Sequence, residues 1–192
     1  MLRTFIAVDF PLEIIDKARR IITYLKTQTP ENALKWVVPE NLHLTLTFLG
    51  DIPEEDLEQI RAITSEALKS QPPFEITIEG LGLYPGVKNP RVVWLGITGS
   101  QPLIDIHNKL DQALQKADVT PENRDYSPHL TIARVRRHTD HETAMEIGKT
   151  LSHYKVDSLG DIKIEEIQLY QSKLTPQGPI YTKLLTVPLN KV

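Results

Sequence analysis

Cysteine is absent from this chain of 192 residues. Without thiols, the protein can form neither a disulfide nor a thiolate metal site. Apolar runs are all short of the roughly 20 residues that a membrane-spanning helix needs, so we expect no membrane partner. An excess of charge of one sign is also absent, since the formal net charge is only −3 at pH 7. This argues against a protein that holds long nucleic acid mainly by charge, but it leaves room for a basic pocket around one phosphate.

The apolar residues, 40% of the chain, are enough for the core of one domain at this length. We recognise no signal peptide, and this observation together with the missing cysteine predicts a cytoplasmic enzyme. Nothing in the composition demands assembly, so we expect a monomer.

The most informative pattern is the tripeptide His-Leu-Thr, which occurs at His43–Thr45 and again at His129–Thr131. Each copy lies in an apolar run that favours a β-strand. On a strand, residues i and i+2 point to the same face, so each copy places an imidazole and a hydroxyl roughly 6–7 Å apart on one face. A single His-x-Thr is commonplace, but two copies in similar surroundings indicate one pocket with two histidines and two threonines.

The order of predicted elements also repeats. Apolar periodicity predicts strand–helix–strand–helix–strand twice, in halves of about 1–85 and 86–192. The Gly- and Pro-rich segment 80–90 is expected to be a loop or irregular hairpin at the join. A pseudo-twofold arrangement of the halves would bring the motif strands face to face across a cleft. The predicted strands are 3–10, 35–38, 41–50, 74–79, 91–97, 127–135, 161–170 (with an irregularity near 165–166) and 181–187, and the predicted helices are 12–24, 53–67, 102–117 and 140–152.

This set of side chains suits the opening of a cyclic phosphodiester by water. In-line displacement at phosphorus needs a base on the attacking side and an acid on the leaving side, and two histidines can supply both near neutral pH. The threonine hydroxyls can hydrogen-bond the phosphate oxygens. Arg134 has the opposite strand parity to His129, so it can join the pocket only if the strand bends or ends near Ala133. The scheme requires no metal, and the sequence offers no obvious carboxylate cage for Mg²⁺.

These motifs resemble those of a known family, the two-histidine phosphoesterases. Within it, the sequence is most similar to the bacterial and archaeal RNA 2′,3′-cyclic phosphodiesterases, also called 2′-5′ RNA ligases. The resemblance runs nearly from end to end, and its segments are 3–8, Trp36-Val37, 41–50, 90–94, 127–134 and 172–181.

The resemblance implies a bilobal α+β fold, with two pseudo-symmetric antiparallel sheets and outer helices around a central cleft. It also implies hydrolysis of RNA 2′,3′-cyclic phosphate ends to 2′-phosphomonoesters, without metal or cofactor, and reverse 2′-5′ ligation as a minor direction. By the same analogy, His43 donates a proton to the departing 3′ oxygen and His129 accepts a proton from water. Thr45 and Thr131 bind phosphate oxygens, and Arg134 is the cation that binds the phosphate.

Several aromatic residues are candidates for stacking on a nucleobase. Tyr84, in the Gly- and Pro-rich segment, is the better candidate for this role. Trp94 lies in an apolar run, and Phe48 has the parity of the apolar residues of its strand, so we expect both in the core. Tyr181 is interpreted as structural.

Two other interpretations stay open. The same chemistry could serve small cyclic nucleotide phosphates or 2′-5′ oligoadenylates instead of RNA ends. Alternatively, the chain could be a non-catalytic module that binds RNA ends, although both histidines and both threonines are intact. A metal-dependent phosphodiesterase is the least favoured interpretation.

Overall fold

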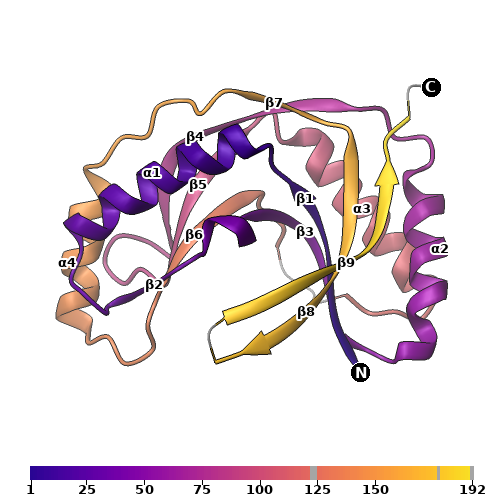
Figure 1. Cartoon of the computed structure of the whole chain (residues 1–192), viewed down its shortest axis with the longest axis horizontal. Helices are drawn as coiled ribbons and strands as arrows, with labels where there is room; N and C mark the ends of the chain where they lie inside the picture. Colours follow the sequence, from indigo (N-terminus) through magenta and orange to yellow (C-terminus); the bar gives the residue numbers. More distant parts are fainter. Residues whose placement is uncertain (122–124, 177, 191–192) are drawn as a thin grey trace.

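The computed structural model describes residues 1–121, 125–176 and 178–190. It contains two antiparallel β-sheets that lie side by side, each with helices on its outer side (Figure 1). Helices α1 (Leu12–Gln28) and α4 (His141–Ser152) cover one sheet, while α2 (Leu57–Leu68) and α3 (Gln101–Gln115) cover the other. This arrangement confirms the predicted α+β fold of two sheets with outer helices.

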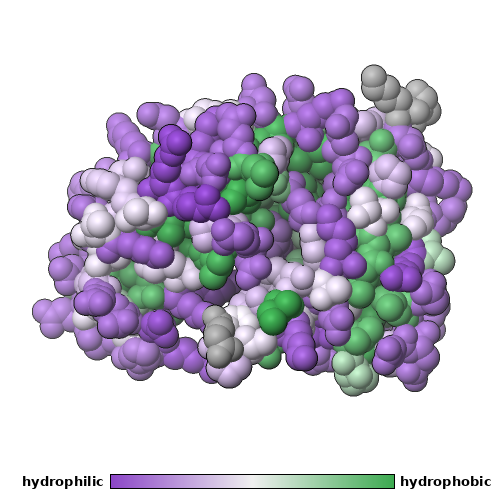
Figure 2. Space-filling model, in the orientation of Figure 1, coloured by the Kyte–Doolittle hydropathy of each residue, from purple (hydrophilic) through white to green (hydrophobic). Residues whose placement is uncertain are grey.

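The two sheets differ in size. The four-stranded sheet has the order β3-β1-β8-β9, and the five-stranded sheet has the order β2-β6-β5-β4-β7. Figure 2 shows the surface hollowed between the sheets, next to the tip of the β8–β9 hairpin. The strands are β1 (Leu2–Asp9), β2 (Leu34–Trp36), β3 (His43–Ile52), β4 (Phe74–Tyr84), β5 (Val92–Thr98), β6 (His129–Val135), β7 (Asp161–Ile164), β8 (Glu166–Thr175) and β9 (Gly178–Pro188), and the short 3-10 helices are η1 (Pro39–Asn41) and η2 (Glu54–Asp56).

The helices form where apolar residues recur at helical spacing. In α1 the buried stripe continues to Leu25, so this helix runs about one turn beyond the predicted end at Tyr24. Helix α4 begins where the Asp140 side chain accepts a hydrogen bond from the backbone N–H of Thr143, which satisfies one of the free donors of the first turn. No helix in the described part of the chain has the length and apolar composition that crossing a membrane requires.

The strand predicted over residues 161–170 is two strands, one in each sheet. The buried apolar positions change from even to odd numbers, since Ile162 and Ile164 are buried in β7 and Ile167 and Leu169 in β8. The parity changes at Glu165, whose carbonyl accepts a hydrogen bond from the backbone of Leu189. The predicted irregularity is therefore the point where the chain passes from the five-stranded to the four-stranded sheet.

The Gly- and Pro-rich segment forms an irregular hairpin. Strand β4 continues to Tyr84 and pairs with β5 across a β-bulge between Glu79 and Leu81. The hairpin loop lies against α4, because a Cβ at Gly148 would be only 1.8 Å from the carbonyl oxygen of Val87. Glycine at position 148 therefore allows the helix and the loop backbone to touch.

Each sheet contains strands from both predicted halves of the sequence. In the four-stranded sheet β1 of the first half pairs with β8 of the second, and in the five-stranded sheet β4 of the first half pairs with β5 of the second. Helix α3, in the second half, contacts β3 of the first. The lobes therefore do not coincide with the halves 1–85 and 86–192, and the pseudo-repeat itself stays a prediction.

Candidate functional site

The first His-x-Thr motif lies on β3, where a β-bulge decides which side chains share its face. In the pairing with β1, His43 is opposite Asp9 and Thr45 is opposite Ala7, but the register then skips Leu46. Phe48 is opposite Phe5 and thus returns to the face of His43 and Thr45. The expectation that Phe48 belongs to the core fails for this reason: its ring is partly exposed and lies 6.0 Å from that of Phe5.

The second motif lies on β6, which has a bulge at the equivalent place. His129 pairs with Gly96 and Thr131 with Trp94, and the register then skips Ile132. Arg134 pairs with Val92 and so joins the face of His129 and Thr131. This is the irregularity near Ala133 that the sequence required for Arg134 to reach the pocket. Both strands therefore carry the same local geometry, with a histidine and a threonine followed by a bulged residue.

The two imidazoles are oriented in the same way. The Nδ1 atom of His43 lies 2.8 Å from the carbonyl oxygen of Asn41, and Nδ1 of His129 lies 2.7 Å from that of Ser127. Because a carbonyl oxygen can only accept, Nδ1 carries the hydrogen in each ring. Each Nε2 is therefore available to exchange a proton with a substrate.

His43 sits in an aromatic environment on the four-stranded sheet. Its ring centroid is 4.8 Å from that of Phe5 and 5.1 Å from that of Tyr181, which meets it edge to face. Burial lowers the pKa of His43, while the hydrogen bond to Asn41 and the charge of Asp9 act in the opposite direction. His129 is exposed. The two histidines therefore occupy different environments although their motifs match.

Asp9 is held beside His43 by two other side chains of the same sheet. The Tyr170 hydroxyl lies 2.7 Å from each carboxylate oxygen of Asp9, and Nζ of Lys183 lies 3.0 Å from Oδ2. Burial and the hydrogen bond to Asp9 raise the pKa of Tyr170, so its hydroxyl remains a donor. The carboxylate is therefore fixed as a charge near His43, with its own hydrogen bonds satisfied.

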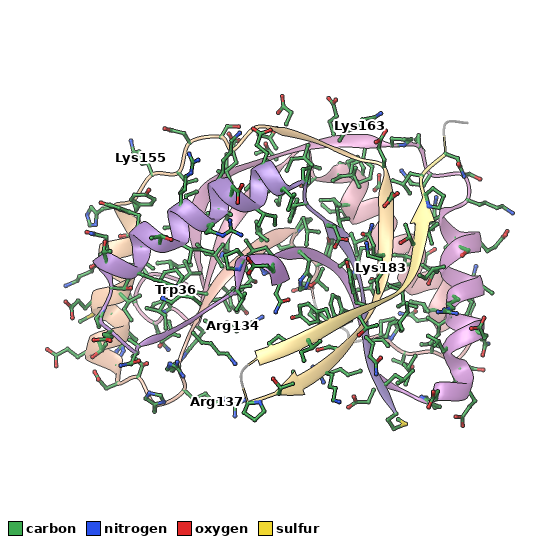
Figure 3. The ribbon with its side chains drawn as sticks, viewed as in Figure 1. Trp36, Arg134, Arg137, Lys155, Lys163 and Lys183 are labelled. Carbon is green, nitrogen blue, oxygen red and sulfur yellow. The ribbon has the colours of Figure 1, made fainter. Side chains whose placement is uncertain are left out.

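Arg134 lies between the two sheets. Its side chain is exposed and lies between the five-stranded sheet and the β8–β9 hairpin (Figure 3). Burial raises the pKa of Tyr181, and the charges of Arg134 and Arg3 oppose that shift, which places both guanidinium groups near this phenol. Tyr181 in turn contacts His43, so the phenol is a neighbour of both the first histidine and the cation of the second motif. The Asn41 side chain also donates to the Pro179 carbonyl oxygen at 3.0 Å, tying the start of β3 to the hairpin.

The aromatic residue beside His129 is Trp94. Its ring centroid lies 6.1 Å from that of His129, and the indole covers Gly82, where a Cβ would be 2.0 Å from Trp94 Cζ2. Trp94 is partly exposed, so its expected place in the core is wrong. Tyr84 is 66% exposed and pairs with Val92, next to Trp94 on the same face of β4 and β5.

Sequence reasoning missed two residues of this arrangement. Tyr181, which the sequence indicates only as structural, contacts His43. Trp94, expected in the core, is the second, and its signal is Gly82, which lies in the segment expected to be a loop but belongs to β4, where a missing side chain leaves room for an indole. Within the described residues, no three His, Asp or Glu side chains lie close enough to hold a metal ion.

The sequence and the fold were compared with known proteins. Residues 11–173 match the model of the 2′-5′ RNA ligase superfamily. A protein of Methanothermobacter thermautotrophicus named RNA 2′,3′-cyclic phosphodiesterase is 38% identical over 182 residues, which cover 95% of this chain and 96% of that protein. One of the same name from Archaeoglobus fulgidus is 37% identical over 183 residues, covering 95% and 98%.

Solved structures agree with this assignment. The protein TT0787 of Thermus thermophilus superposes with a TM-score of 0.79 at 25% identity, over 98% of each chain. Escherichia coli LigT complexed with 3′-AMP superposes with a TM-score of 0.77 at 26% identity, over 99% of each chain. The matching motifs, fold and relatives lead to one conclusion: the chain belongs to the 2′-5′ RNA ligase superfamily.

Proposed function

We propose that this protein hydrolyses RNA 2′,3′-cyclic phosphate ends to 2′-phosphomonoesters without a metal ion, using His43 and His129 as an acid–base pair. The observation that carries the proposal is the matched geometry of the two motifs, in which each Nδ1 is tied to a backbone carbonyl and each Nε2 is available. Relatives named RNA 2′,3′-cyclic phosphodiesterase support the substrate class. The Escherichia coli LigT structures with 3′-AMP and with phosphate support nucleotide phosphate as the ligand.

In the proposed reaction, water attacks phosphorus in line with the bond to the 3′ oxygen. The neutral Nε2 of His129 accepts the proton of the water as the new P–O bond forms. The bond between phosphorus and the 3′ oxygen breaks, and protonated Nε2 of His43 donates its proton to that oxygen. The products are a 3′-hydroxyl and a 2′-phosphomonoester, and the two histidines end in exchanged protonation states.

Three other side chains are assigned to the charge that builds on the phosphate. The hydroxyls of Thr45 and Thr131 share the faces of the two histidines and are assigned to the non-bridging oxygens. Arg134 supplies a planar, permanently charged fork that matches two phosphate oxygens. Tyr84 is proposed to stack on a base near the phosphate, because its ring is exposed at the end of β4.

The environment of His43 bears on its role as the acid. A lowered pKa makes the imidazolium a stronger acid, although fewer molecules carry the proton at neutral pH. The charge of Asp9 and the anionic phosphate both favour the protonated ring. We therefore keep His43 as the donor and His129 as the acceptor.

The same arrangement accommodates a 5′-hydroxyl in place of water. Attack by that hydroxyl, with the 3′ oxygen again leaving, forms a 2′-5′ phosphodiester, which we expect to be the minor direction in water. We propose that the protein acts as a monomer in the cytoplasm, on RNA ends, with small nucleotides as additional substrates.

The test is product analysis in EDTA with wild type, His43→Ala and His129→Ala. The substrates are an oligoribonucleotide ending in a 2′,3′-cyclic phosphate, a nucleoside 2′,3′-cyclic phosphate and a 2′-5′ oligoadenylate. We expect a 2′-phosphate from the first substrate and, in both variants, a fall of turnover to a small residual rate. A 3′-phosphate would contradict the assigned leaving group, loss of activity in EDTA would contradict the metal-free reaction, and binding without turnover would favour a binding module.

A further inference from the structure

A cluster of side chains on the side of β3 away from His43 joins this strand to the segment just before β6. Its centre is His107 on α3, whose side chain is only 13% exposed. Nδ1 of His107 lies 2.8 Å from the carbonyl oxygen of Leu46 and 3.1 Å from Oγ1 of Thr47. Because the carbonyl can only accept, Nδ1 is the donor. Leu46 is the bulged residue directly after Thr45, so this hydrogen bond holds the point where β3 changes parity.

Asp111, one turn further along α3, binds the next residue of the bulge. The Thr47 hydroxyl donates to Oδ1 of Asp111 at 3.1 Å, and Nε2 of His107 faces Oδ2 of the same carboxylate at 3.6 Å. Two consecutive residues of the bulge are thus tied to one face of one helix. A strand fixed in this way resists the one-residue slip that would turn His43 and Thr45 away from the cleft.

The segment that leads into the second His-x-Thr motif contacts the His107 imidazole through Tyr126. The Tyr126 ring stacks on the His107 ring, with centroids 4.2 Å apart and planes 21° apart. Tyr126 directly precedes Ser127, the residue whose carbonyl oxygen accepts the hydrogen bond from Nδ1 of His129. The Tyr126 hydroxyl is buried and finds no hydrogen-bond partner among the described residues, so its contact with the cluster here is made by the ring.

We infer that His107 is a positioning residue that aligns the two catalytic histidines with each other, through Leu46 for His43 and through Tyr126 for His129. The inference rests on the proposed roles of the two histidines. The alignment of the two imidazoles affects the rate strongly, because a displacement of reacting groups by 1 Å can cost about a hundredfold in rate. His107 therefore acts on the turnover step through geometry, with no contact to substrate.

The experiment separates the two connections with paired variants. His107→Phe keeps a ring for Tyr126 but removes the donor to Leu46, while His107→Asn keeps a donor at the position of Nδ1 but removes the ring. Tyr126→Leu removes the stacking, and Tyr126→Phe, which removes only the unpartnered hydroxyl, is its matched control. Each is assayed on a nucleoside 2′,3′-cyclic phosphate at a temperature where circular dichroism shows it to be folded.

We expect kcat to fall about tenfold or more in His107→Phe and Tyr126→Leu, with KM within about twofold, as misaligned groups require. Tyr126→Phe should match wild type, and His107→Asn should recover part of the loss seen in His107→Phe. If His107→Phe and Tyr126→Leu lower only the melting temperature and keep kcat, the positioning role is wrong.

An independent readout keeps this inference separate from the proposed function. The ring signals of His43 and His129 are followed by NMR in the same variants, with His43→Ala and His129→Ala assigning the peaks. We expect the His129 signals to shift in Tyr126→Leu and the His43 signals in His107→Phe, with neither shifting in Tyr126→Phe. Unmoved signals overturn the inference whatever the turnover. Shifted signals support the coupling even if the alanine variants retain activity, a result that would refute the proposed function instead.

Discussion

Replacement of Arg134 tests whether the bulge at Ile132 serves the site. The bulge brings Arg134 to the face of His129 and Thr131, and its charge reaches Tyr181 beside His43. Arg134→Met removes the charge and the fork while keeping a flexible side chain. Hydrogen bonds between charged groups contribute about 1.5–3 kcal/mol, which corresponds to a loss of about 10- to 150-fold in kcat/KM. Arg134→Lys should lie between this variant and wild type, because it keeps the charge without the fork.

The assay is kcat/KM on a nucleoside 2′,3′-cyclic phosphate, with urea unfolding measured in parallel. Arg134 is exposed, so the free energy of unfolding should change by less than about 0.5 kcal/mol. Arg20→Met is the matched control, because Arg20 is an exposed arginine on α1. If Arg134→Met keeps kcat/KM within twofold of wild type, Arg134 does not bind the reacting phosphate and the reasoning from the bulge is refuted.

Three further predictions follow from the packing and from the environment of His43. Burial lowers the pKa of His43 below the value of about 6.5 for an unfolded histidine, so the unfolded chain binds the proton more readily. The contribution of neutral His43 to stability is thus fully present above that pH and is lost as the pH falls toward the folded-state pKa. The free energy of unfolding, measured against pH in wild type and in His43→Asn, should show this loss in wild type only. Parallel pH dependences of the two proteins would contradict it. Gly82→Val forces a Cβ into the Trp94 indole and should cost about 1–3 kcal/mol of unfolding free energy and perturb Trp94 fluorescence; unchanged fluorescence would refute the predicted clash. Gly148→Ala places a methyl group against the Val87 carbonyl and should destabilise by a similar amount, measured by thermal unfolding, whereas Gly86→Ala, where a Cβ meets nothing within 4 Å, is the control.

Much of the fold was accessible from the sequence because its signals are local. Helical spacing of apolar residues located α1 and α3, and the repeated His-Leu-Thr located β3 and β6. The number of strands in each sheet was not accessible, because pairing between β1 and β8 depends on contacts far apart in the chain. The break at Glu165 was visible only as an irregularity, since a parity change does not reveal that the chain changes sheets.

The candidate site was predictable to a similar degree. Strand alternation correctly placed His43 with Thr45 and His129 with Thr131 on common faces. Alternation failed beyond the threonines, where a bulge moves Phe48 and Arg134, because a bulge leaves no period-two signal. The contact of Tyr181 with His43 was not predictable, because a hairpin far along the chain brings the two together and no local sequence pattern indicates such a contact.

The pH dependence of kcat/KM in wild type and in the two histidine variants tests the central claim most directly. An acid and a base acting on one phosphate give wild type a bell-shaped profile. We predict that His43→Ala loses the alkaline limb, since that limb reports loss of the proton from the acid, and that His129→Ala loses the acidic limb. If both limbs persist in either variant, the two histidines are not the acid–base pair of this protein.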